Sequence, residues 1–119
     1  RGMIGRLYSV VLDCPDPAAL ASFYTELLGL PRTDTDDDWV DIGDDHTRLS
    51  FQLAPDLREP RWPDPDRPQQ FHLDIEVDDV EAAEPRVLAL GATRLPGGGE
   101  TFRVYADPAG HPFCLVWHS

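Results

Sequence analysis

The apolar residues at the start of the chain follow first the spacing of a strand and then the spacing of a helix. Residues 7–12 (LYSVVL) are rich in β-branched and aliphatic side chains, which is typical of a strand. After a break at residues 14–17, apolar side chains recur at helical spacing: Leu20, Phe23, Tyr24, Leu27 and Leu28. Asp16 is a good N-cap before Pro17, and Gly29 ends the repeat. These residues predict a strand followed by a helix.

Two shorter strands and a linker are predicted next. Residues 39–42 and 49–53 have the composition of strands, and the turn-forming residues 43–45 lie between them. Repeated prolines then interrupt residues 54–70 and remove amide donors from the backbone. We therefore expect a linker without regular structure inside one domain.

The same order of elements starts again after the linker. Residues 71–77 (FHLDIEV) predict a strand, and Asp79 is a second N-cap before a helix over 80–90 that ends at Gly91. Pro85 should kink this helix or delay its start. Further strands are predicted at residues 92–95, 101–106 and 112–117.

The two stretches are an internal repeat. VLDCPDPAALASFYTELLG resembles LDIEVDDVEAAEPRVLALG, so that Asp16 corresponds to Asp79 and Gly29 to Gly91. The spacing between Gly29 and Gly91 is one residue shorter than the spacing between Asp16 and Asp79. Applied to the rest of the chain, this shorter spacing matches Asp45 with Asp107, and the FQL of residues 51–53 with the FCL of residues 113–115.

This repeat predicts an α+β fold in which two βαβββ modules form a curved mixed sheet around one cavity. We take Met3 as the natural start and expect a single domain over residues 3–119. Its first module spans 3–54, its proline-rich linker 55–70 and its second module 71–119.

The charge of the chain bears on its partners. The formal net charge is −12, from 22 acidic and 10 basic residues. Such a field repels phosphate backbones and anionic membranes, so we expect neither nucleic acid nor a membrane as partner. Many acidic residues fall within 34–45, without the spacing of a calcium loop, and we expect a solvated loop face there.

The cysteines and the apolar runs bear on the compartment. Only Cys14 and Cys114 occur, which does not resemble the disulfide framework of a small secreted domain. No apolar run has the length of a membrane span, and no signal-peptide pattern opens the chain. These features predict a cytoplasmic protein.

Residues at equivalent positions of the two repeats that point inward should converge on the cavity. Ser9 pairs with His72 on the first strands, and Gln52 pairs with Cys114 on the last strands. Two tryptophans are further candidates: Trp39 and Trp62 stack on a flat ligand, or Trp62 instead anchors the linker.

The repeated strand, Asp and helix, together with the closing DPAGHPFCLV of residues 107–116, resemble the vicinal oxygen chelate superfamily. Its members include glyoxalase I, extradiol dioxygenases, fosfomycin-modifying enzymes and bleomycin-binding proteins, often as dimers. The resemblance implies one small-molecule site and a possible homodimer. In the metal-using members it also implies a divalent ion held at the positions of Ser9, Gln52, His72 and Cys114.

The residues at these four positions depart from the metal-binding pattern. Only His72 is a standard ligand at its place, and Cys114 replaces the expected carboxylate. Zinc could accept His72, Cys114 and Gln52 and keep one open position. Since soft and hard donors are mixed, we expect no metal and no other cofactor, with zinc as the alternative.

Three functions follow. In the first, the protein binds a small, partly apolar organic molecule, as a sequestering or resistance protein does, through Ser9, Trp39, Gln52, His72 and Cys114. In the second, it is a lyase or isomerase in which His72 is catalytic and moves a proton next to a carbonyl, with or without a divalent metal. In the third, it acts through its sheet edges. Each site residue also has a purely structural alternative. His72 is then a hydrogen-bonded core histidine, Cys114 a small buried residue, and Gln52 a hydrogen-bond partner of a neighbouring backbone group.

Overall fold

The computed structural model describes residues 5–61, 63–69 and 71–118. The chain divides into two compact units between Leu57 and Arg58, within the predicted linker. We call them the first half and the second half. Neither described helix combines the length and the apolar character that crossing a lipid bilayer requires.

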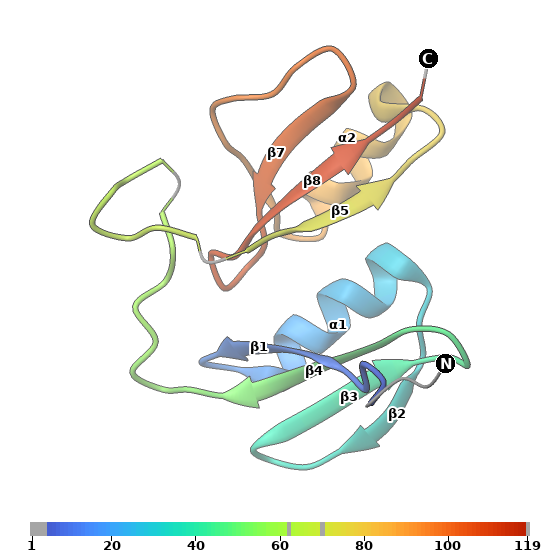
Figure 1. Cartoon of the computed structure of the whole chain (residues 1–119), viewed down its shortest axis with the longest axis vertical. Helices are drawn as coiled ribbons and strands as arrows, with labels where there is room; N and C mark the ends of the chain where they lie inside the picture. Colours follow the sequence, from blue (N-terminus) through green and yellow to red (C-terminus); the bar gives the residue numbers. More distant parts are fainter. Residues whose placement is uncertain (1–4, 62, 70, 119) are drawn as a thin grey trace. The chain divides into compact units, whose positions relative to one another are not determined.

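The first half is a four-stranded mixed sheet with one helix (Figure 1). Its strands lie in the order β1-β4-β3-β2, with β1 parallel to β4 and the other neighbours antiparallel. The elements in chain order are β1 (Val10–Cys14), α1 (Pro17–Leu28), β2 (Arg32–Thr35), β3 (Trp39–Gly43) and β4 (Arg48–Leu53). Helix α1 packs against β3 and β4.

The second half repeats this topology. Its strands lie in the order β5-β8-β7-β6, and the parallel pair is again formed by the first and last strands of the half. The elements are β5 (Leu73–Glu76), α2 (Val80–Ala89), β6 (Thr93–Arg94), β7 (Phe102–Ala106) and β8 (Pro112–Val116). The α+β class and the two βαβββ modules are therefore confirmed, while the single cavity between the modules stays a prediction.

Both helices begin where the sequence predicts. The Oδ1 atom of Asp16 accepts a hydrogen bond from the backbone N–H of Ala19, and that of Asp79 accepts from two backbone N–H groups of the first turn of α2. Gly29 ends α1 with a φ of 72°, a left-handed conformation that glycine adopts without strain. Helix α2 runs from Val80 through Pro85, so of the two effects expected of Pro85, a kink or a late start, the late start does not occur: the Asp79 cap sets the first turn.

The first half differs from the sequence expectation at three places. Strand β1 begins at Val10 instead of residue 7, because its ladder with β4 begins there. Strand β2 was not predicted, since all four of its residues are polar and exposed. The expected acidic loop over residues 34–45 is in part regular structure: Asp34 belongs to β2, and Asp41 is buried in β3.

The linker has the predicted irregular form. Residues 54–61 and 63–69 contain turns, and no helix or strand falls among these residues. The backbone N–H of Arg61 donates to the carbonyl of Arg67, which closes one short loop. Trp62 lies outside the described residues.

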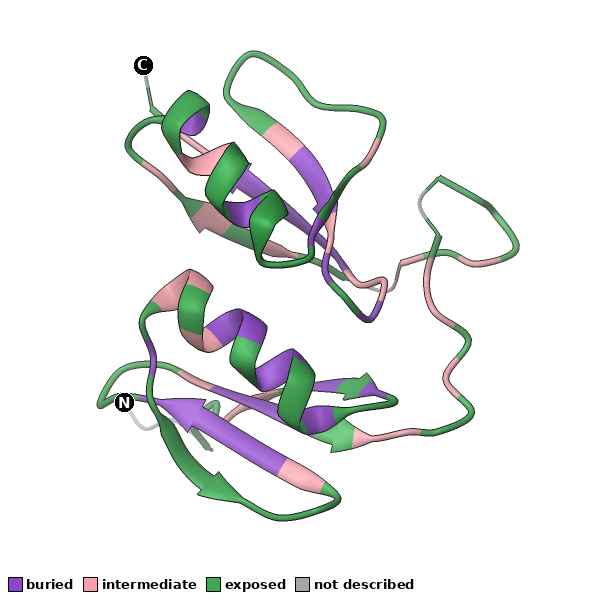
Figure 2. Cartoon of the chain, turned by 180° about the vertical axis from the view of Figure 1, so that it is seen from behind, coloured by how far each residue is buried: buried purple, intermediate pink, exposed green. Residues whose placement is uncertain are grey.

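The core of each half lies between the helix and one face of its sheet (Figure 2). In the first half the ring of Tyr24 stacks on Phe51 at 5.7 Å, and in the second half Tyr105 stacks on Phe113 at 5.5 Å. The Tyr105 hydroxyl donates to Glu84 at 2.6 Å, and this carboxylate also pairs with Arg94. Tyr105 therefore ties β7 to α2 from inside the core.

The Tyr105 hydroxyl gives the fold a dependence on alkaline pH. Burial, with the hydrogen bond to Glu84, raises the pKa of Tyr105 from 10.0 to about 12. Because the folded state holds the neutral phenol, this contribution is complete below pH 10 and is lost as the pH rises toward 12. We expect Tyr105→Phe to cost about 1–2 kcal/mol at neutral pH and to flatten the decline in stability above pH 10.

Urea denaturation at a series of pH values measures this effect. Both chains should carry Cys114→Ser, since burial also raises the pKa of that thiol from 9.0 to about 11 and adds a similar decline. An equally steep decline with and without the tyrosine hydroxyl would contradict the assignment.

Candidate functional site

Each sheet has one face packed on its helix and one face turned away from it, which we call the open face. Residues paired across neighbouring strands share a face, and alternate residues of a strand lie on opposite faces. In the first sheet the open face carries Ser9, Val11, Trp39, Asp41, Ser50 and Gln52. In the second sheet it carries His72, Asp74, Phe102, Val104, Cys114 and Val116.

A buried carboxylate organises the open face of the first sheet. Asp41 is 9% exposed and accepts hydrogen bonds from the indole N–H of Trp39 at 2.7 Å and from the Ser50 hydroxyl at 2.6 Å. The Arg48 guanidinium lies 3.4 Å from its other oxygen. The predicted contact residue Trp39 therefore lies on the open face with its N–H already bonded.

The same network determines what Ser9 can offer a ligand. The hydroxyls of Ser9 and Ser50 lie 2.6 Å apart. Since Ser50 uses its single proton toward Asp41, Ser9 is the donor in this pair. Ser9 is left with oxygen lone pairs alone, so it presents a hydrogen-bond acceptor.

The turns between the last two strands show how the halves correspond. In the first half, the Oδ1 atom of Asp44 accepts from the backbone N–H groups of His46 and Thr47. In the second half, the Oδ1 atom of Asp107 accepts from those of Ala109 and His111. Asp44, not Asp45, is therefore the counterpart of Asp107.

The strand register after these turns corrects the pairing of Gln52 with Cys114. In β3 and β4 the pair nearest the turn is Gly43 with Arg48, and Ser50 lies two residues further along. In β7 and β8 the pair nearest the turn is Ala106 with Pro112, and Cys114 lies two residues further along. Ser50 is thus the structural counterpart of Cys114. Gln52 is exposed on the same face and remains a predicted contact.

The second open face brings together His72, Cys114 and a residue that was not predicted, Asp74. The Nε2 atom of His72 lies 3.1 Å from a carboxylate oxygen of Asp74. With the Cys114 sulfur included, one polar atom from each residue lies within 4.8 Å of the others. Asp74 is the register partner of Cys114 in the parallel pair of β5 and β8. Its place two residues after His72 was the available signal, because alternate strand residues share a face.

Cys114 is a buried thiol next to a carboxylate. It is 6% exposed. Burial, followed by the charge of Asp74 and a hydrogen bond to it, raises the pKa of the Cys114 thiol to about 11. The side chain is therefore protonated at neutral pH, which agrees with its interpretation as a small buried residue and not as a metal-free nucleophile.

A pocket of about 820 Å³ lies over the second open face. All of its lining residues belong to the second half: Gln69, His72, Asp74, Thr101, Phe102, Val104, Pro112, Cys114, Val116, Trp117 and His118. Phe102 and Trp117 give it aromatic walls. Trp39 lies on the open face of the first sheet and stays a predicted contact. The predicted residues His72 and Cys114 do line this pocket.

The residues do not fit the oxygen-rich metal site that the superfamily resemblance implies. The register places the four corresponding positions at Ser9, Ser50, His72 and Cys114. The two serine hydroxyls are bonded to one another and to Asp41, so the first half supplies no charged ligand there. A hard divalent ion prefers carboxylate oxygens, which these four positions lack.

Comparisons with known proteins agree with this fold. The sequence model of the glyoxalase-like domain matches residues 9–116. A fosfomycin resistance protein from Listeria monocytogenes, solved with manganese and sulfate, superposes with a TM-score of 0.75 at 16% identity, covering 98% of this chain and 93% of that chain. The bleomycin-binding protein of Streptomyces verticillus, solved with copper(II)-bleomycin, gives 0.60 at 20% identity, covering 98% and 100%.

A glyoxalase/bleomycin resistance/dioxygenase family enzyme from Burkholderia phytofirmans gives a TM-score of 0.71 at 20% identity, covering 92% of this chain and 95% of that chain. No curated protein matches the sequence. At these identities the solved structures show a common fold, and the sequence model shows the family. The chain belongs to the glyoxalase-like family, within the vicinal oxygen chelate superfamily.

Proposed function

We propose that the protein binds and sequesters a small, partly apolar organic molecule in the pocket on the open face of the second sheet. The observation that carries this proposal is the pocket itself, at about 820 Å³. Small-molecule sites have volumes of about 300–1,000 Å³ and combine apolar walls with a few polar groups. Phe102, Val104 and Trp117 supply such walls, and His72 with Asp74 supplies polar groups.

Three observations support binding over turnover. The Cys114 thiol is neutral because its pKa is raised, so it is a poor nucleophile. The four positions of the superfamily's metal lack the charged oxygen ligands of its enzymes. One protein with the same fold is a bleomycin-binding protein. Ser9, Trp39 and Gln52 remain proposed as further contacts from the first half.

The lyase or isomerase alternative is favoured by one contact. Asp74 lies 3.1 Å from the His72 Nε2 atom, and a carboxylate in this position orients an imidazole for proton transfer. His72 also lines the pocket. In this alternative His72 moves a proton at the carbon next to a carbonyl group.

Thermal shift tests the binding proposal. Chelator-treated protein is mixed with bleomycin or with a neutral naphthol as a flat aromatic probe. A ligand at a hundred times its Kd stabilises the native state by about 2.7 kcal/mol, so a bound probe should raise the Tm by several degrees. Phe102→Ala should weaken binding about tenfold, which is about 1.4 kcal/mol of lost contact. The matched control is Leu90→Ala, which removes a similarly exposed apolar side chain outside the pocket lining.

The thermal shift of the wild-type chain and the comparison of the two variants can each contradict the binding proposal. It fails if neither probe raises the Tm, or if Phe102→Ala and Leu90→Ala bind equally well. Proton NMR of the probe after incubation separates binding from turnover. Recovery of unchanged naphthol and bleomycin agrees with sequestration, whereas chemical conversion that His72→Gln abolishes would establish the enzymatic alternative.

A further inference from the structure

The cluster of His72, Asp74 and Cys114 combines a nitrogen, an oxygen and a sulfur donor in one half of the chain. Asp74 and Cys114 lie directly opposite one another on the adjacent strands β5 and β8, and His72 immediately precedes β5. Their ligand atoms lie within 4.8 Å of one another. Among the residues that the structure describes, this is the one His, Cys, Asp and Glu group that could hold a metal ion.

These donors are those of a zinc site. Zinc accepts thiolate, imidazole and carboxylate ligands about 2.0–2.3 Å from the ion, in tetrahedral geometry. The His72 and Asp74 side chains are 40% and 60% exposed, so they can rotate to close the remaining distance around an ion. Cys114 is held in the sheet and would serve as the fixed ligand. Three protein ligands leave the fourth position open to water or a bound molecule.

We propose that His72, Asp74 and Cys114 form a zinc site that is complete within the second half. It differs from the site implied by the superfamily resemblance, which draws ligands from both halves and places no ligand at Asp74. Asp74 supplies the carboxylate that the four superfamily positions lack. It follows His72 on the same face of the second sheet. This site does not depend on the organic ligand proposed above, because all three donors belong to the chain.

Zinc binding at this site releases a proton. The Cys114 thiol loses its proton to solvent as the sulfur–zinc bond forms, and the His72 imidazole binds in its neutral form. The Asp74 carboxylate is exchanged from its contact with His72 to the ion. Apparent affinity for zinc should therefore increase with pH.

Cobalt(II) titration of the metal-free full chain, under reducing and anaerobic conditions, tests the site without any organic ligand. A cysteine ligand produces a thiolate-to-cobalt charge-transfer band in the near ultraviolet. We expect this band to saturate at one equivalent, to release protons into a weakly buffered solution, and to disappear when zinc is added.

Variants identify the ligands. Cys114→Ser should abolish the charge-transfer band, while His72→Gln and Asp74→Asn should weaken binding by at least about tenfold. Glu76→Gln is the matched control, because Glu76 follows Asp74 on the same face of β5 but lies outside the cluster. Cys14→Ala is the control for the second thiol.

Three results would overturn the proposal: no charge-transfer band in the wild-type chain, a band that persists in Cys114→Ser, or an equal loss of affinity in Glu76→Gln and Asp74→Asn. Failure of the bleomycin and naphthol experiment would leave the cobalt titration unaffected, so the two proposals can fail separately.

Discussion

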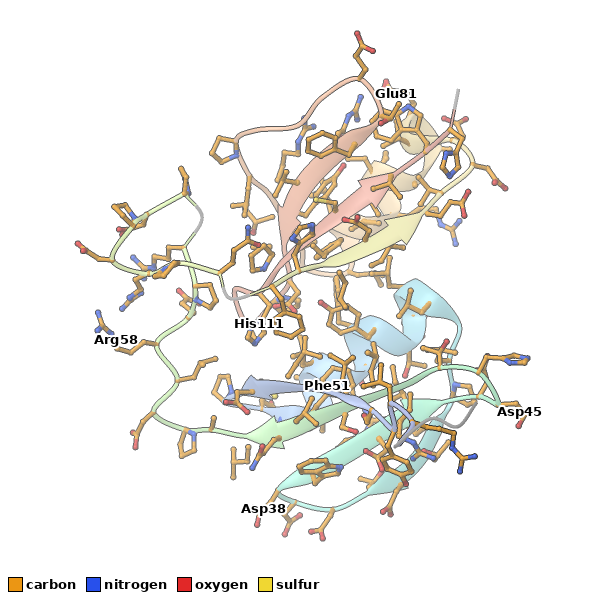
Figure 3. All side chains as sticks on the ribbon, viewed as in Figure 1. Asp38, Asp45, Phe51, Arg58, Glu81 and His111 are labelled. Atoms are coloured by element: carbon orange, nitrogen blue, oxygen red, sulfur yellow. The ribbon has the colours of Figure 1, made fainter. Side chains whose placement is uncertain are left out.

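Replacement of Phe51 by alanine is expected to lower the free energy of unfolding by about 3–5 kcal/mol, the usual cost of removing a fully buried phenylalanine. Phe51 is 0% exposed and lies in the middle of β4 (Figure 3). Its ring stacks on Tyr24 of α1, and its register partners are Leu12 and Val40 on the two neighbouring strands. One deletion therefore removes contacts with the helix and with both flanking strands.

Urea denaturation followed by circular dichroism measures this loss. Val11→Ala is the matched control, since Val11 is 37% exposed and lies on the open face of the same sheet. The control should lose less than about 1 kcal/mol. Equal midpoints for the two variants would show that the core of the first half is not organised around Phe51.

Asp41→Ala is expected to cost about 2–4 kcal/mol, although it removes one of many acidic residues from a strongly negative chain. The substitution leaves the Trp39 indole N–H and the Ser50 hydroxyl without their acceptor, and each unsatisfied polar group costs about 1–3 kcal/mol. It also removes the ion pair with Arg48, whose side chain is 30% exposed and contributes less. Relief of charge repulsion does not offset these losses.

Asp38→Ala separates the network from the charge. Asp38 is exposed just before β3, and Asp45 lies just after the other end of that strand (Figure 3). Removing Asp38 changes the net charge by the same amount without touching the Asp41 network, so its midpoint in urea should stay close to wild type. Asp41→Asn should fall between the two, because the amide oxygen keeps one acceptor. An Asp41→Ala midpoint equal to that of Asp38→Ala would contradict the network.

The elements that the sequence predicts well are those whose side chains carry the signal themselves. Asp16 and Asp79 cap helices whose apolar residues recur at helical spacing, and both helices begin as expected. Strand β2 carries no such signal. It is held by backbone pairing with β3, and its side chains are all polar, so neither alternation nor β-branched runs mark it.

The candidate site was predictable in part for a related reason. His72 and Cys114 lie together on one open face, as the repeat suggests. The sequence pairing carried the shorter spacing after the helices onward, whereas in the structure the turn before Cys114 is one residue longer than the turn before Ser50. The pairing therefore fell on Gln52, two residues beyond Ser50 in β4. The sequence did not identify Asp74 as a site residue. Any residue two positions from a histidine along a strand lies on the same face as that histidine, and a common face does not by itself indicate a common function.

The exposed strand β2 has a consequence for the chain at high concentration. An outer strand presents unpaired backbone groups to which a second molecule can add, and this is a common beginning of fibrils. Here that border carries Asp34 and continues into Asp36, Asp37 and Asp38. Two molecules that approached each other along it would bring these carboxylates together. The polar sequence that kept β2 from being predicted therefore also disfavours edge-to-edge association of two molecules along β2. We expect any association between molecules to use other surfaces.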